Sequence, residues 1–130
     1  MARMSQELKN IMIENVKTVG LEDTVQDIAV LMNKHQIGCV IIVNEKQPVG
    51  IVTERDIMKR VVYKGIAPKN LKAPDVMSKP LITASPSTPA GDAAKAMLKW
   101  NIKKLPVAEN GQLVGVVTLT DLLRVEGVIE

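Results

Sequence analysis

The chain has 130 residues, of which 46% are hydrophobic, enough for one compact domain with a real core. Its net charge is only +3, and it contains a single cysteine, Cys39, and a single histidine, which excludes an internal disulfide and a zinc site of the usual ligand set. No apolar run approaches the roughly 18 residues of a membrane span and no signal-peptide pattern opens the chain, so we expect a cytoplasmic protein without membrane association.

The first half of the chain predicts a lead-in helix over residues 1–10, followed by strand, helix, strand, strand and helix. Val25, Ile28 and Met32 recur at the spacing of one buried helix face. The polar residues 44–48 separate two apolar runs, as in a hairpin. The expected strands are Val16–Val19, Cys39–Val43 and Val49–Val52, and the expected helices run from Val25 to about His35 and from Thr53 to about Tyr63.

The second half repeats this order after a linker at residues 64–74, which contains glycine and proline and has no apolar period. Asn110-Gly111 is a favoured pair for a tight hairpin turn. The expected elements are an extended segment Leu81–Thr83, a helix that carries Ala90, Ala93, Ala94 and Met97, strands Leu105–Ala108 and Leu113–Val117, and a helix from Thr118.

The two halves keep one register without a gap. Met12 and Met77 are 65 positions apart (77 − 12), and the same offset pairs Thr18 with Thr83, Asp27 with Asp92, Gly50 with Gly115, Thr53 with Thr118 and Asp56 with Asp121. This pattern predicts two repeats, residues 11–63 and 75–126, in one compact pair with an internal pseudo-two-fold. The expected fold class is therefore α/β (α+β), with two tandem β-α-β-β-α repeats that cover each other's exposed sheet face.

The most informative repeated feature is a strand that passes directly into a helix, at Gly50–Asp56 and at Gly115–Asp121. We call these segments the first and the second corner. The unpaired amides at a helix N-terminus receive phosphate readily, while a carboxylate repels phosphate and suits the hydroxyls of a ribose. The structural alternative is a capping box between the threonine and the aspartate. The recurrence of the same threonine and aspartate at both corners weakens that alternative. A nucleoside phosphate is a ligand that fits the pair.

These features resemble a tandem pair of CBS domains, also called a Bateman module. The resemblance covers roughly residues 11–126 and rests on motifs that occur in order in both halves. They are Ile11-Met12 and Val76-Met77, Thr18 and Thr83, Asp27-Ile28-Ala29 and Asp92-Ala93-Ala94, the segment Ile102–Val107, and the two corners. The family's Leu-Pro-Val on the second strand occurs only in the second half, where the first half has Gly38-Cys39-Val40 instead.

The resemblance implies ligand clefts between the two repeats, each with one corner's threonine and aspartate on phosphate and ribose. Thr53 and Asp56 would serve one cleft, and Thr118 and Asp121 the other. The further candidates are Lys17 and Ile82 beside the short strands, and Gly38, Cys39, Lys103 and Lys104 at the start of the second strands. The implied ligand is AMP, ADP, ATP or S-adenosylmethionine, with no tightly bound cofactor.

Two of these assignments carry alternatives. Arg55 is a candidate phosphate contact because a guanidinium offers several donors in a fixed fork, and otherwise it is an exposed helix residue. Lys103 and Lys104 are neighbours on a strand and point to opposite faces, so at most one of them faces a given cleft.

We expect no catalysis and no metal site, because no nucleophile stands beside a base and no carboxylate cluster for Mg²⁺ is visible. The expected function is a stand-alone regulatory module that signals ligand occupancy to an unknown regulated protein. Surplus apolar residues at 57–63 and 119–125 predict a homodimer. Two alternatives stay open: a structural dimerisation module whose corners only cap helices, and a nucleic-acid-associated protein that uses the basic segment 59–79. The aromatic content of 2% disfavours nucleic acid, since base stacking needs aromatic platforms.

Overall fold

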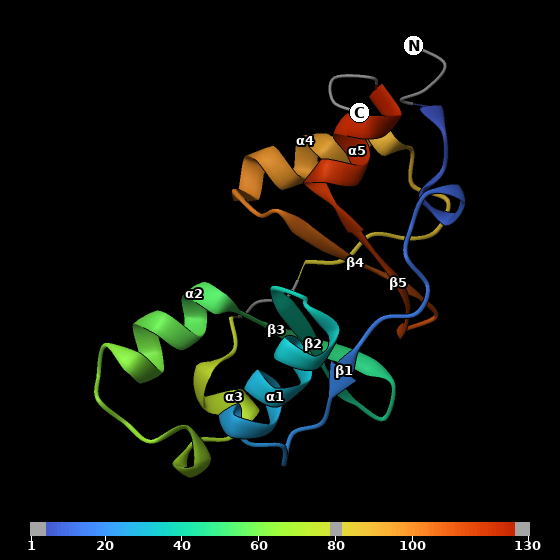
Figure 1. The fold of residues 1–130 in the computed structure, drawn as a ribbon. Coiled ribbons are helices and arrows are strands. Elements are labelled where there is room, and N and C mark those ends of the chain that lie inside the picture. The colour runs from blue at the N-terminus through green and yellow to red at the C-terminus, as the bar shows by residue number, and fades with distance from the viewer. Residues whose placement is uncertain (1–4, 79–81, 127–130) are drawn as a thin grey trace. The chain divides into compact units, whose positions relative to one another are not determined.

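The computed structural model describes residues 5–78 and 82–126, which form two compact units (Figure 1). The first-repeat unit is Lys17–Leu81, and the second-repeat unit joins Met1–Val16 to Ile82–Glu130. Both units combine strands with helices, which confirms the expected α/β class.

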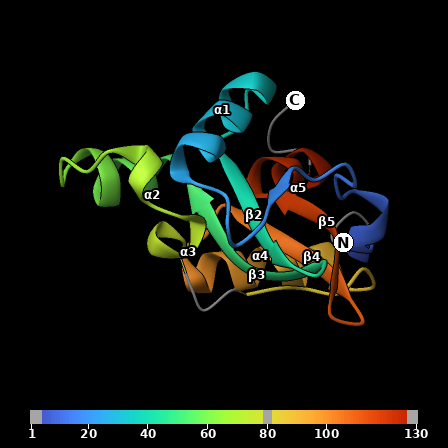
Figure 2. The ribbon, with the colours of Figure 1, turned by 90° about the horizontal axis from the view of Figure 1, so that it is seen from below.

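The first-repeat unit contains a sheet of three strands in the order β1-β2-β3. Strand β1 runs parallel to β2, whereas β2 and β3 form the antiparallel hairpin that is seen lengthwise in Figure 2. The strands are β1 (Thr18–Val19), β2 (Cys39–Asn44) and β3 (Gln47–Thr53). The helices are α1 (Val25–His35), α2 (Glu54–Ile57), a π-helix Met58–Val62, a 3₁₀ helix Pro68–Asn70, and α3 (Ala73–Val76).

The core of this unit lies against one face of the β2–β3 hairpin. Val40 and Val52 are directly opposite each other in the ladder and are buried, with Ile42 two residues further along β2. Helix α1, the π-helix and α3 supply the facing side chains. These are Val25, Ile28 and Met32 of α1, Val61 of the π-helix, and Ala73 and Val76 of α3.

The second-repeat unit contains the hairpin of β4 (Lys104–Glu109) and β5 (Gln112–Thr118), with α4 (Ala90–Trp100), α5 (Leu119–Glu126) and a 3₁₀ helix Leu8–Asn10. Of the extended segment expected at Leu81–Thr83, residues 82 and 83 form no strand, and a single parallel bridge follows them, from Ala84 to Val107. Leu81 and its neighbours 79–80 lie outside the described residues. The core of the unit is formed by Leu8, Ala90, Ala93, Met97, Leu105, Val107, Val117 and Leu122.

The segment at the start of each repeat packs in the unit of the other repeat. Residues 8–13 belong to the second-repeat unit, where Leu8 is fully buried and Ile13 pairs with Val116. Residues 73–78 stand 65 positions later and belong to the first-repeat unit, where Ser78 pairs with Ile51. The second-repeat unit is therefore built from two separate segments, whereas the first-repeat unit is one continuous segment. Of the expected lead-in helix, residues 1–4 lie outside the described part, and residues 5–10 contain a bridge from Glu7 to Pro89 and the 3₁₀ helix Leu8–Asn10 instead of an α-helix.

The two hairpins have the same design. Each turn has two residues with positive φ, Glu45 and Lys46 in the first and Asn110-Gly111 in the second, as the tight turn between twisted strands requires. Each ladder also shifts register once, between Ile42 and Val43 and, 65 positions later, between Val107 and Ala108. The internal repeat read from the sequence is thus confirmed down to its irregularities.

Candidate ligand-binding corners

The first corner is a complete capping box at the start of α2. The Thr53 hydroxyl oxygen accepts a hydrogen bond from the Asp56 amide at 3.2 Å, and the Thr53 amide donates to Oδ2 of Asp56 at 2.9 Å. The Thr53 hydroxyl also donates to that oxygen at 3.1 Å. The structural role considered for this pair is therefore present in the fold.

The Asp56 carboxylate has further partners in its own unit. Ser78 donates its hydroxyl to Oδ1 at 2.9 Å, and an Arg60 guanidinium nitrogen lies 3.6 Å from the same oxygen. Asp56 is only 6% exposed and is the buried charged residue among those described. A buried carboxylate needs such a set of donors, because leaving its charge unpaired would cost several kcal/mol.

The second corner repeats the backbone with looser contacts. The Asp121 amide donates to the Thr118 hydroxyl oxygen at 3.0 Å, but the Thr118 amide lies 3.4 Å from Oδ2 of Asp121. Within the described part of the chain, the other carboxylate oxygen faces only Arg124, at 3.7 Å. The side chain of Asp121 is 23% exposed, so its carboxylate keeps acceptor capacity that Asp56 has already used.

Both corners depend on a glycine in the strand that leads to them. A Cβ on Gly50 would collide with the Met77 side chain, and one on Gly115 would stand 2.6 Å from the sulfur of Met12 and 3.1 Å from the Ile13 carbonyl oxygen. The paired methionines that mark the repeat thus pack directly over the paired glycines. This contact explains why both residue types recur at one offset.

The start of each second strand lies beside its corner. The Glu54 amide donates to the Gly38 carbonyl at 3.1 Å, and the Leu119 amide donates to the Lys103 carbonyl at 2.8 Å. In the ladders, Cys39 pairs with Thr53 and Lys104 with Thr118. The structure therefore brings Gly38 and Cys39 to the first corner, and Lys103 and Lys104 to the second.

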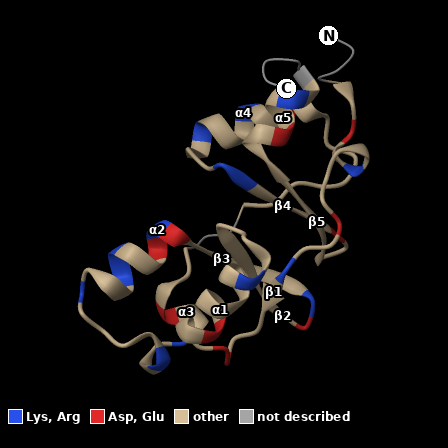
Figure 3. Cartoon of the chain, in the orientation of Figure 1, with Lys and Arg blue, Asp and Glu red and all other residues tan. Residues whose placement is uncertain are grey.

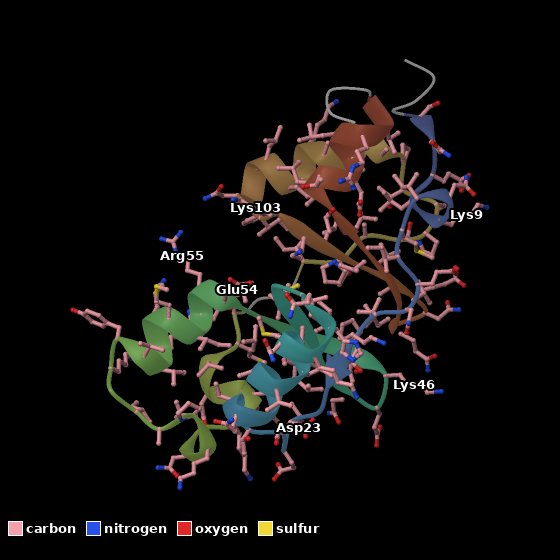
Figure 4. All side chains as sticks on the ribbon, viewed as in Figure 1. Lys9, Asp23, Lys46, Glu54, Arg55 and Lys103 are labelled. Carbon is pink, nitrogen blue, oxygen red and sulfur yellow. The ribbon has the colours of Figure 1, made fainter. Side chains whose placement is uncertain are left out.

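The remaining candidates stand further from the corners or point away. Lys17 precedes β1, which is separated from β3 by β2, and its carbonyl accepts a hydrogen bond from the Ile41 amide at 3.5 Å. Ile82 packs partly against the core of its unit. Arg55 is exposed and projects away from α2 in Figure 4, which is compatible with both assignments considered for it. Lys103 is exposed and Lys104 half-buried.

A model of the CBS domain family matches the chain twice, at residues 8–63 and 73–127. The chain belongs to the CBS domain family. It is 44% identical to an uncharacterized protein of Methanopyrus kandleri, in an alignment that covers 86% of this chain and 58% of the relative. A second relative, an uncharacterized protein of Methanocaldococcus jannaschii, is covered to 56%. The chain thus spans little more than half the length of these curated relatives.

Solved structures agree with this CBS assignment. An uncharacterized conserved protein from Pyrococcus horikoshii superposes with a TM-score of 0.85 at 30% identity, over 95% of this chain and 93% of that one. A CBS domain pair crystallised in complex with 5′-methylthioadenosine and S-adenosyl-L-methionine superposes with a TM-score of 0.84 at 28% identity, over 94% and 96%. The resemblance read from the motifs is confirmed.

The first-repeat unit also contains a pocket of about 360 Å³ between α1 and the start of α2. Gly38 is its one lining residue among the sequence-based candidates, and neither Thr53 nor Asp56 lines it. Its walls are Ala29, Met32, Asn33, Gln36, Ile37, Gly38, Glu54 and Ile57. One lining residue, Gln36, has a left-handed backbone with φ 54°. This conformation is uncommon for residues other than glycine, so the sequence gives no sign of it.

The basic segment of this CBS pair is partly neutralised within the first-repeat unit. Arg60 donates to the carbonyls of Val76 and Met77 at 2.7 and 3.0 Å. Lys72 bonds Glu22 at 2.6 Å, and this hydrogen bond, followed by the charge of Glu22, raises the pKa of Lys72. Lys59, Lys64 and Lys69 are exposed, and Lys79 lies outside the described residues. Figure 3 shows α2 beginning with acidic residues and the basic ones following.

Two further findings apply to the described residues 5–78 and 82–126. They contain no group of three or more His, Cys, Asp or Glu side chains placed to hold a metal ion. None of the helices there combines the length and the apolarity that crossing a bilayer requires.

Proposed function

We propose that this CBS pair is a regulatory module that binds an adenosine-containing ligand at a Thr-x-x-Asp corner and signals occupancy to a partner. The observation that carries the proposal is the duplicated junction at which a strand ends in a threonine and the next helix has an aspartate as its third residue. A CBS pair of 28% identity holds 5′-methylthioadenosine and S-adenosyl-L-methionine, which supports an adenosine ligand here.

The chemistry of a corner suits the two polar parts of such a ligand. The first amides of the helix and the threonine hydroxyl are donors for a phosphate or carboxylate group. The aspartate accepts hydrogen bonds from ribose hydroxyls, and its charge makes those bonds stronger than neutral ones. The chain has no phenylalanine, one tyrosine and one tryptophan, so we expect aliphatic side chains around the adenine. AMP, ADP, ATP and S-adenosylmethionine are the candidates.

A thermal-shift panel tests this proposal with AMP, ADP, ATP and S-adenosylmethionine, and GMP and ribose 5-phosphate as matched controls. A ligand that binds only the folded state contributes about 2.7 kcal/mol when its free concentration is 100 times its Kd. For a domain of this size the rise in Tm is on the order of 5 to 15 °C. ATP with Mg²⁺ should stay intact during the incubation. If no adenosine ligand moves the Tm at millimolar concentration, the proposal fails.

The structural dimerisation module is the second candidate, because the capping hydrogen bonds give the threonine and the aspartate of both corners a role in the fold itself. It predicts no response to the whole panel. Under either function we propose that the protein acts as a homodimer.

A further inference from the structure

The two corners share one backbone and differ in the side chains around the aspartate. The Ser78 amide donates to the Ile51 carbonyl at 2.8 Å, and 65 positions earlier the Ile13 amide donates to the Val116 carbonyl at 2.9 Å. The backbone therefore presents residues 78 and 13 in the same way. One is a hydroxyl donor and the other an aliphatic side chain. The same offset pairs Arg60 with Val125, so the second corner lacks both donors.

At the first corner these donors complete the hydrogen bonding of the carboxylate. Oδ2 of Asp56 accepts from the amide and the hydroxyl of Thr53, while Oδ1 accepts from Ser78 and faces Arg60. A carboxylate has about four acceptor positions. A ribose diol therefore has to displace a donor that is already bound, and the displaced group loses its partner in a buried place.

Arg60 is itself fixed in this position. Its guanidinium donates to the carbonyls of Val76 and Met77 at the end of α3, and it extends from the π-helix, in which the Tyr63 amide reaches back five residues to the Met58 carbonyl at 2.8 Å. Its side chain is 34% exposed. Releasing Asp56 would thus disturb the contact between the π-helix and α3 as well.

Among the described residues, the second corner has no donors that correspond to Ser78 and Arg60. Asp121 faces Arg124, whose side chain is 56% exposed, at 3.7 Å. Ile13 is 47% exposed, and Val125 is half-buried. A ribose hydroxyl can donate to Asp121 without displacing a buried donor.

Resting on the proposed adenosine binding, we propose that the chain binds one ribose, at Thr118 and Asp121, instead of two. Ser78 and Arg60 occupy acceptor positions of the Asp56 carboxylate, which is therefore not available to a second ribose. In this role Ser78 and Arg60 are specificity-determining residues that do not touch the ligand. Asp56 is then a structural residue.

Calorimetric titration with AMP and with S-adenosylmethionine measures the stoichiometry and the affinity. We expect one molecule per chain in the wild type and at least a 10-fold loss of affinity in Asp121→Asn. Asp56→Asn should keep the stoichiometry and change the affinity less than 3-fold. It should lower the Tm in the absence of ligand by on the order of 5 to 15 °C, because asparagine accepts on one oxygen only and its amide group would face one of the two pairs of donors that surround the carboxylate. Asp121→Asn should lower the Tm by less than about 5 °C.

A transplant provides the matched test. Ile13→Ser with Val125→Arg places the two donors of the first corner beside Asp121, and should weaken binding at least 10-fold. The control pair Ile13→Val with Val125→Met keeps both side chains aliphatic and should bind as the wild type does. Circular dichroism of each variant reports whether it is folded.

The outcomes separate the two proposals. Two molecules per chain, or equal loss of affinity in Asp56→Asn and Asp121→Asn, overturns the single-ribose inference and leaves adenosine binding standing. Equal loss of Tm in these two variants without ligand overturns the closure of the first corner, whatever binds. If neither AMP nor S-adenosylmethionine nor any other member of the panel binds the wild type, the proposed function and this inference both fail.

Discussion

Met12 and Met77 hold the strands of the two corners in place, and each does so over a glycine. The side chain that a substitution at Gly115 would add meets the Met12 sulfur and the Ile13 carbonyl oxygen, 2.6 and 3.1 Å from the new Cβ. A methionine can change its rotamer, but the carbonyl belongs to the bridge between Ile13 and Val116 and cannot move alone. The glycine is therefore required by packing, not by an unusual φ.

Gly115→Ala is accordingly expected to destabilise the protein by about 1–3 kcal/mol, the usual range for an overpacked core. Urea unfolding gives the free energy directly. Gly20→Ala is the matched control, because its new Cβ would have only an ordinary contact of 3.8 Å with Asp23, and we expect a change within about 0.5 kcal/mol. Equal effects of the two substitutions would contradict the packing argument.

Lys72 and Glu22 form an exposed ion pair whose effect depends on pH. The hydrogen bond from Lys72 to Glu22 raises the pKa of the lysine above its usual value of 10.5. A lysine whose pKa is raised in the folded state contributes stability below the unfolded-state pKa and loses it as the pH rises through the folded-state pKa. The contribution is small, since solvent screens an exposed pair.

The Tm difference between the wild type and Lys72→Gln is therefore expected to be small but positive at pH 8. It should disappear as the pH rises above the usual lysine pKa, and also in high salt. Lys69→Gln is the control, because Lys69 is exposed on the neighbouring 3₁₀ helix and forms no ion pair with any described residue. A difference for Lys72→Gln that grows with pH would refute this sign.

At the level of elements, helix starts are the features that the sequence predicted best. Thr24 and Asp27 form a full capping box before α1, with hydrogen bonds of 3.0 and 3.1 Å, because the residues that make it are only three positions apart. The equivalent helix α4 begins after Pro89 and has no side-chain cap. The repeat thus preserves the helix while changing the way it begins.

We expect Thr24→Ala to cost about 0.5–2 kcal/mol, the range measured for lost N-caps. Thr83→Ala is the matched control, because Thr83 is exposed and caps no helix in the described structure. Urea unfolding of the two variants side by side measures the difference. No difference between them would mean that packing of Val25 and Ile28 alone holds the start of α1.

Elements that depend on distant contacts were not predictable in the same way. The π-helix Met58–Val62 follows a normal helical turn, and its wider hydrogen bond coincides with the reach of Arg60 to carbonyls 16 and 17 residues away. The placement of residues 8–13 and 73–78 in the opposite units also rests on long-range bridges. The corner motifs predicted the capping bonds. The repeat pairs Ser78 with Ile13 by position, but it does not show that Ser78 donates to the aspartate of a corner, because that contact depends on the fold.

At the scale of the whole molecule, the exposed apolar side chains bear on the predicted homodimer. Val61 and Leu122 were among the apolar residues expected to exceed the need of the core, but they are core residues with 1% and 2% exposure. Met58, Val62 and Tyr63 remain, at 66%, 68% and 87% exposed. In the second-repeat unit the exposed large apolar residues are instead Ile13 and, on α4, Leu98 and Trp100. The surface available to a second copy is therefore richest along the helix that follows the first corner.

Light scattering at micromolar protein should give twice the 14.2 kDa of one chain. Met58→Glu with Val62→Glu should shift the mass to that of a monomer, because a buried carboxylate without a partner costs several kcal/mol. Leu98→Glu is the matched control on α4 and should leave the dimer intact. A monomer mass for the wild type would refute the dimer. Dissociation by Leu98→Glu alone would place the interface on α4, in which case Met58 and Val62 are exposed for another reason.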